Sequence, residues 1–159
     1  MKNQSLYLFF CFFIFGCGGG GGGSSMPEQV IVDNDSSNQG ETCTDTNRIG
    51  MKKCDLKHDN IDRFYYVYTP NNLDSNKSIP VLFAFHGYGS SAMRHLNYTN
   101  YFSIADLNNF IVVYPQGSTT ATLSSHWNVG GWTSKSTTKD IDFVDTVIDL
   151  LKDKIPIDE

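Results

Sequence analysis

The chain has 159 residues, a formal net charge of −5, a hydrophobic content of 40% and an aromatic content of 13%. This composition is typical of a globular protein and excludes a wholly disordered chain. The acidic balance provides no basic patch, so we do not expect nucleic acid to be a partner.

The first residues predict export. Lys2 precedes an apolar run of ten residues, Leu6–Phe15, which is far shorter than the roughly 20 residues that span a bilayer. This pattern predicts a signal peptide over residues 1–16. The end of the run, Ile14–Cys17, resembles a bacterial lipobox, which would make Cys17 a lipidated first residue and place the protein in the cell envelope. The alternative is an ordinary signal peptide, an incidental Cys17 and an extracellular protein.

Residues 17–41 are expected to form a flexible tether, because six consecutive glycines, Gly18–Gly23, are followed by mostly polar residues. Cys43 and Cys54 are separated by ten residues in a polar segment of an exported chain. This spacing favours a local disulfide. The alternative, a metal pair, lacks further Cys or His at ligand spacing, so we predict no metal site.

Ordered structure is expected from about Thr42 onward. The segment Ile61–Thr69 is dense in aromatic and β-branched residues and predicts a strand that ends at Pro70. Asn71–Ser78 is polar and predicts a hairpin-type loop. The continuous apolar run Pro80–Phe85 predicts a strand buried on both faces, as in a parallel sheet covered by helices.

This strand ends abruptly at His86-Gly87-Tyr88-Gly89. Glycines on both sides of Tyr88 allow a sharp turn that brings backbone N–H groups close to another molecule. Alternatively, the glycines serve only to join a strand to a helix.

The next elements complete a βαβ unit. Apolar residues at near-helical spacing predict one amphipathic helix over Met93–Asn108, and Phe110–Tyr114 reads as a second buried strand stopped by Pro115. The long loop Gly117–Lys139 carries both tryptophans, Trp127 and Trp132. Loops of this length are usually functional or disordered, and the presence of both tryptophans favours a loop that contacts substrate. Alternatively, the tryptophans pin the loop to the domain.

The last helix is predicted from residues that recur at intervals of three and four: Ile141, Val144, Ile148, Leu151 and Ile155. Thr138 is the expected N-cap, and Pro156 ends the helix. Acidic residues in its first turn and lysines in its last turn complement the helix dipole.

The order of these pieces resembles a known family. From about residue 61 to its end, the chain is similar to the secreted α/β-hydrolase esterases that include polyhydroxybutyrate depolymerases and feruloyl or acetylxylan esterases. The matching pieces are Arg63–Pro70, Val81–Gly89, Phe110–Gly117, Trp127-Asn128 and the helix Asp140–Lys154 with Ile157-Asp158.

The resemblance implies an α/β fold over residues 42–159, namely the N-terminal part of an α/β-hydrolase with a mainly parallel sheet flanked by helices. It implies that the Tyr88 backbone N–H is an oxyanion-hole donor, with Gly87 and Gly89 shaping the turn. His86 is then a buried structural residue, and His58, His95 and His126 are expected to be exposed rather than catalytic.

The family would next show a strand and the G-x-S-x-G nucleophile elbow. The sequence contains no such motif, so the nucleophile, acid and base are expected outside these 159 residues and the chain itself is expected to be inactive. A fragment of this kind is expected to fold stably only within a longer chain.

Three functions follow as hypotheses. The first is a cofactor-independent serine hydrolase of carboxylic esters on polysaccharide or polyester, held at a membrane only by a lipid anchor. The second is a non-catalytic surface lipoprotein that binds carbohydrate or another ligand through the loop with Trp127 and Trp132. The third is an exported serine peptidase on the same scaffold.

Overall fold

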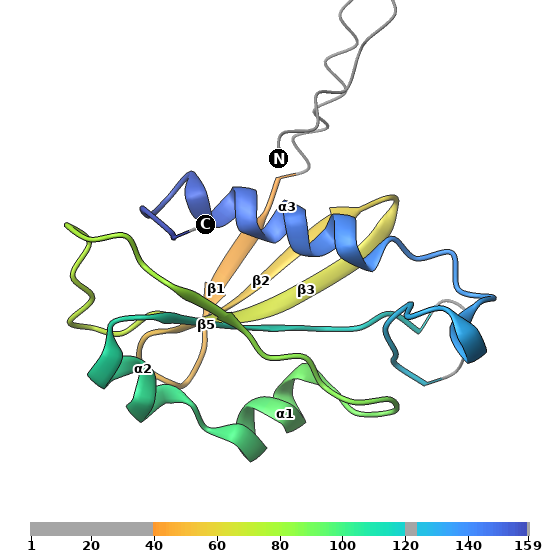
Figure 1. The fold of residues 1–159 in the computed structure, drawn as a ribbon, viewed down its shortest axis with the longest axis horizontal. Coiled ribbons are helices and arrows are strands. Elements are labelled where there is room, and N and C mark those ends of the chain that lie inside the picture. The colour runs from red at the N-terminus through yellow and green to blue at the C-terminus, as the bar shows by residue number, and fades with distance from the viewer. Residues whose placement is uncertain (1–39, 120–123, 159) are drawn as a thin grey trace, which may run out of the picture. The chain divides into compact units, whose positions relative to one another are not determined.

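A computed structural model describes residues 40–119 and 124–158. The predicted signal peptide, Cys17 and nearly all of the tether lie outside the described residues. Five strands form one sheet, with α3 on one face and α1 and α2 on the other (Figure 1). The strands are β1 Thr42–Asp45, β2 Met51–His58, β3 Ile61–Tyr68, β4 Val81–Phe83 and β5 Ile111–Pro115; the helices are α1 Ala92–Thr99, α2 Phe102–Asn108, α3 Asp140–Lys152 and a short 3₁₀ helix, Gly131–Thr133.

The predicted α/β class is confirmed, but the described sheet is mixed rather than mainly parallel. Its strand order is β1-β2-β3-β5-β4, and β4 with β5 is the parallel pair. The other three pairs are antiparallel. For β2 and β3 the short connection requires an antiparallel pair, since the two strands are joined only by Asp59 and Asn60, both at positive φ, as in a tight hairpin.

The region before and after β3 differs from the sequence prediction in two ways. Neither β1 nor β2 was predicted as a strand. The segment 71–78 is not a hairpin loop, because β5 lies between β3 and β4, the two strands that this segment connects.

Two apolar cores lie on the two faces of the sheet, and alternate residues of β5 supply both of them. On the α3 face, Ile111 and Val113 belong to a cluster with Phe143, Val147 and Leu151. On the other face, Val112 and Tyr114 pack with residues of α1 and α2.

The helices differ from the sequence prediction in their details. The single helix expected over Met93–Asn108 is two helices, because Asn100 adopts a left-handed conformation that ends α1. Thr138 is not the N-cap of α3; Lys139 holds that position, and the Thr138 hydroxyl lies 3.3 Å from Asp140.

The buried side of α3 is also shifted from the predicted one. Phe143, Val147 and Leu151 are buried at spacing i, i+4 and i+8, whereas Ile141 is 73% exposed. The prediction was wrong here because Phe143, which is not among the residues with the predicted apolar spacing, faces the sheet.

The strand β4 is not buried on both faces as predicted. Leu82, in the middle of the strand, and Phe85, two residues beyond its end, remain 38% and 43% exposed. In the described part of the chain β4 is an edge strand, with β5 as its one neighbour in the sheet.

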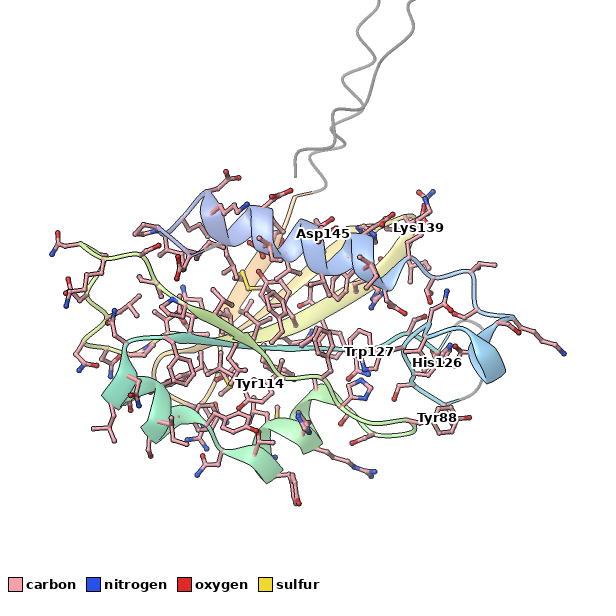
Figure 2. The ribbon with its side chains drawn as sticks, viewed as in Figure 1. Tyr88, Tyr114, His126, Trp127, Lys139 and Asp145 are labelled. Carbon is pink, nitrogen blue, oxygen red and sulfur yellow. A yellow bond between two sulfur atoms is a disulfide. The ribbon has the colours of Figure 1, made fainter. Side chains whose placement is uncertain are left out.

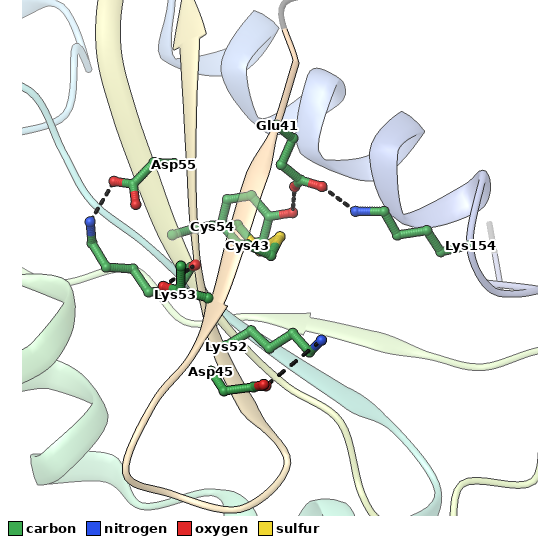
Figure 3. The surroundings of a disulfide bond; sticks show 10 residues. Glu41, Cys43, Asp45, Lys52, Lys53, Cys54, Asp55 and Lys154 are labelled. Carbon is green, nitrogen blue, oxygen red and sulfur yellow. Dashed lines mark hydrogen bonds and ion pairs between the residues drawn. A yellow bond between two sulfur atoms is a disulfide. The ribbon is translucent and has the colours of Figure 1, made fainter.

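The strand β1 is fastened to the domain at two points (Figure 3). Cys43 lies directly opposite Cys54 in β2, and their Sγ atoms form a disulfide. The Glu41 carboxylate accepts a hydrogen bond from the Tyr65 hydroxyl and pairs with Lys154, just beyond α3. Burial and this carboxylate raise the pKa of Tyr65, so its hydroxyl stays protonated as a donor.

Candidate functional site

The turn Gly87–Ser90 follows the carboxyl end of β4. The Ser90 N–H donates to the Gly87 carbonyl over 3.1 Å, and Gly89 has a φ of +69°, which favours glycine. A Cβ atom built on Gly87 would meet nothing within 4 Å. Neighbouring described residues therefore do not require a glycine at position 87, and the space beside this backbone is open to another molecule.

The segment Ser125–Trp127 braces the turn. The Gly89 N–H donates to the Ser125 carbonyl over 2.8 Å, and the Ser125 hydroxyl donates to the Ser90 carbonyl. The indole N–H of Trp127 donates to the His86 carbonyl over 2.9 Å, and its ring packs edge-on against Phe85. The turn and the long loop thus form one hydrogen-bonded unit, with Tyr88 at its outer end (Figure 2).

His86 is buried and has a structural role, as the resemblance implies. Its Nε2 atom accepts the Gly117 N–H over 2.9 Å, and its Nδ1 atom lies 2.8 Å from the Gly87 carbonyl. These partners require a proton on Nδ1 and none on Nε2. Only in its neutral form can the imidazole therefore join the first residue of the turn to the backbone just after β5.

The expectation that His126 is exposed was wrong. Its side chain is fully buried, and its backbone N–H donates to the Ser118 carbonyl over 2.9 Å. The long loop folds back on itself here, which encloses the imidazole.

A buried ion pair supports the loop that carries Ser125 and Trp127. The Arg63 guanidinium in β3 lies 2.8 Å from the Asp140 carboxylate at the start of α3, and both side chains are at least 93% buried. The guanidinium also lies 4.0 Å above the Phe143 ring. Desolvation lowers the pKa of Arg63, and the charge of Asp140 acts in the opposite direction.

Asp140 connects this ion pair to the braced turn. Its Oδ2 atom accepts the Asn128 N–H over 2.6 Å, and the Asn128 side chain donates to the carbonyls of Ser136 and Thr138. Arg63 therefore supports the turn indirectly. It pairs with Asp140, and Asp140 holds the backbone of Asn128. The residue before Asn128 is Trp127, which donates to the His86 carbonyl next to the turn. No local pattern in the sequence predicts this network, because Arg63 and Asp140 are far apart in the chain.

The structure thus brings four of the predicted site residues, Gly87, Tyr88, Gly89 and Trp127, into one region. The backbone carries Trp132 in the short 3₁₀ helix of the same loop. Whether Tyr88 donates to an oxyanion and whether either tryptophan contacts substrate remain predictions.

The described residues contain one cluster of potential metal ligands, Glu41, Cys43 and Cys54. The two cysteines are joined in a disulfide and Glu41 is bound by Tyr65 and Lys154. In this oxidised form the cluster offers no thiolate to a metal ion.

We expect Gly117→Ala to destabilise the protein by roughly 1–3 kcal/mol, because a Cβ there would lie 2.5 Å from the His126 carbonyl oxygen. The matched control, Gly87→Ala, should change stability by less than about 0.5 kcal/mol, since its Cβ meets no atom. Urea unfolding of both variants is the measurement. Equal destabilisation by the two substitutions would contradict this packing of the loop.

The protein should lose stability as pH falls below about 6.5. Burial lowers the pKa of His86 from 6.5, the hydrogen bond with the Gly87 carbonyl partly opposes this effect, and the nearby His95 adds a small further lowering. The unfolded chain therefore binds a proton at a pH where the native imidazole is still neutral. The contribution of His86 to the free energy of unfolding is fully present above about pH 6.5. Below that pH it declines, by at most about 1.4 kcal/mol per pH unit, until the pH reaches the lowered native pKa. Urea unfolding at pH values from about 7.5 to 5.5 measures this slope, which His86→Gln should remove.

Comparisons with known proteins relate the chain to esterases. It is 34% identical over 96 residues to the bifunctional acetylxylan esterase/xylanase XynS20E of Neocallimastix patriciarum, covering 60% of this chain and 13% of that protein. It is 39% identical over 64 residues to feruloyl esterase B of Thermothelomyces thermophilus, covering 40% of this chain and 20% of that protein. No protein-family model matches the chain.

Among solved structures, S-formylglutathione hydrolase (FrmB) from Staphylococcus aureus aligns with a TM-score of 0.47 and 17% identity, over 67% of this chain and 41% of that one. No helix among the described residues is long and apolar enough to cross a membrane. The chain spans only a small part of its two curated relatives, and within that part it is a distant homologue of acetylxylan and feruloyl esterases.

Proposed function

We propose that the chain is the N-terminal part of an exported serine carboxylic-ester hydrolase. The observation that carries this proposal is the glycine turn after β4, which is open at Gly87 and braced on its other side by Ser125 and Trp127. Acyl transfer to serine develops negative charge on the carbonyl oxygen, and backbone N–H groups held rigidly in such a turn stabilise that charge.

The Tyr88 backbone N–H is the proposed donor, with Gly87 and Gly89 giving the turn its shape and leaving room for the substrate. The nucleophilic serine, its histidine and the orienting acid are proposed to come from a polypeptide that continues beyond residue 159. The serine ester forms by attack on the acyl carbon with loss of the alcohol, and water then releases the acid.

The proposed substrates are aromatic or acetyl esters on plant polysaccharide, since the two curated relatives are named as acetylxylan and feruloyl esterases. Short polyesters are the other ester class that the sequence resemblance implies. Export, with a lipid anchor at Cys17 and a tether over residues 17–41, belongs to the same proposal and rests on the sequence pattern alone.

Hydrolysis assays of the complete gene product separate the alternatives. We expect release of p-nitrophenol from its acetate ester and no cleavage of a matched peptide anilide.

Gly87→Ala should lower esterase activity at least about tenfold with little change in stability, because its methyl group would occupy the substrate side of the turn. Anilide cleavage would favour the peptidase. Ligand binding without hydrolysis would favour the surface lipoprotein.

A further inference from the structure

The side chain of Gln116 lies beside His86, at the carboxyl edge of the parallel pair β4 and β5. The register of this pair places Phe83 opposite Val113. Three residues beyond these positions, the two strands lead to His86 and Gln116. Because parallel strands end at the same edge of a sheet, both side chains come to the start of the Gly87–Ser90 turn. The Gln116 Nε2 atom lies 3.1 Å from the His86 Nε2 atom.

The same amide also holds the far end of the turn. Its Oε1 atom accepts the N–H of Ala92, the first residue of α1, over 2.9 Å. The first N–H groups of a helix have no partner within the helix, and Ala92 is fully buried, so an acceptor from elsewhere is required. The N-cap hydroxyl of Ser91 accepts from the Arg94 N–H instead. Gln116 thus bonds the residue before the turn and the second residue after it.

The hydrogen-bond partners of Gln116 allow one orientation of its amide. The Ala92 N–H can only donate, so it faces Oε1, and the Gly117 carbonyl, 3.0 Å from Nε2, can only accept. The amide therefore presents an N–H to His86 Nε2 and excludes a proton from that atom. This agrees with the acceptance of the Gly117 N–H by the same imidazole nitrogen.

Gln116 is itself fixed to β3 through its backbone. Its N–H donates to the Phe64 carbonyl over 3.0 Å, and its carbonyl accepts from the Arg63 guanidinium over 3.1 Å. Arg63 is in turn paired with the buried Asp140. A side chain anchored in this way can hold a turn in one geometry, which donors to a developing negative charge require.

We propose that Gln116 is a positioning residue, which keeps the Tyr88 N–H in place by bonding both ends of the segment from His86 to Ala92. It acts through the backbone of the turn and does not touch the substrate. The positioning follows from these hydrogen bonds, whereas its consequence for catalysis rests on the proposed function.

Gln116→Glu, in the complete gene product, tests the bond to His86. This variant keeps the acceptor for Ala92 but turns a carboxylate oxygen towards His86 Nε2, where it favours a proton. We expect the pKa of His86 to rise by at least about one unit. NMR titration of the imidazole measures it, with His86→Gln to identify the signal. His95 on α1 and Arg63 on β3 stay unchanged, so the shift reports the new carboxylate.

Gln116→Leu removes both side-chain bonds and tests the hold on the turn. Amide exchange at Ala92 and Gly89 should become at least about tenfold faster, because Gly89 bonds to Ser125 only while the turn keeps its shape. For p-nitrophenyl acetate, kcat should fall at least about tenfold and KM should change less than about threefold. The reason is that the bond to the oxyanion forms only as the transition state is reached.

Ser91→Ala is the matched control, since it removes the other side-chain acceptor at the start of α1. It should speed exchange at Arg94 and leave kcat and the exchange rate of Gly89 within about threefold of the unsubstituted protein. A merely structural role of Gln116 would make the two variants alike.

An unchanged His86 pKa in Gln116→Glu, or equal effects of Gln116→Leu and Ser91→Ala on Gly89, would overturn the proposal. Faster exchange with an unchanged kcat in an active enzyme would overturn the role in catalysis. NMR and amide exchange require no enzymatic activity. Failure of the positioning role is therefore distinguishable from failure of the esterase assignment, which hydrolysis by the complete gene product tests.

Discussion

Asp140→Ala is expected to lower the free energy of unfolding by about 3–5 kcal/mol, because it leaves the Arg63 guanidinium charged and buried without its partner. The same substitution removes the acceptor of the Asn128 N–H and so frees the loop that carries Trp127. Urea unfolding of the complete gene product measures the loss.

Two further variants make this prediction specific. Replacing both partners, with Arg63→Met and Asp140→Leu, should cost less than Asp140→Ala alone, since no unpaired charge remains. Asp62→Ala, which breaks the exposed pair with Lys57, should cost less than about 1 kcal/mol. If Asp140→Ala does not fold, Asp140→Asn removes the same negative charge and retains the shape of the side chain. A cost for that variant no larger than for Asp62→Ala would contradict the role of the buried pair.

Phe143→Ala should cost about 3–5 kcal/mol, as is typical for truncation of a fully buried aromatic side chain. Its ring packs on the sheet below Arg63, so the substitution removes both apolar contacts and the ring beneath the guanidinium. The free energy of unfolding, with Phe143→Leu as the milder variant, is the quantity to compare.

The matched control lies two residues earlier in the same helix. Ile141→Ala should change stability by less than about 0.5 kcal/mol, because its side chain is exposed. The apolar spacing in the sequence favours Ile141 as a core residue and leaves out Phe143. A larger loss at Ile141 than at Phe143 would show that the spacing gave the correct face and that the structure does not.

The elements that the sequence predicted are those with a strong local signal. Continuous apolar runs identified β4 and β5, aromatic density identified β3, and regular spacing with complementary charges identified α3. The strand β2 was not predicted, because lysines and an aspartate fill its exposed positions and only a few of its residues, such as Cys54 and Leu56, are buried. The split between α1 and α2 depends on the left-handed conformation of Asn100, which spacing does not encode.

The candidate site was predictable in part for the same reason. Gly89 marks the turn directly, because its φ of +69° is a conformation that favours glycine. The supports from Arg63, Asp140 and Ser125 were not predictable, because each lies more than thirty residues along the chain from its partner or from the turn. Only the pairing of β3 with β5 and the return of the long loop bring them together.

The most direct test of the esterase proposal is the nucleotide sequence that follows the codon for Glu159. We expect the reading frame to continue into a short strand and a G-x-S-x-G motif within roughly fifteen residues, as a nucleophile elbow beside the Gly87–Ser90 turn requires. A stop codon at that position would contradict the proposal, because these 159 residues alone contain no nucleophile elbow.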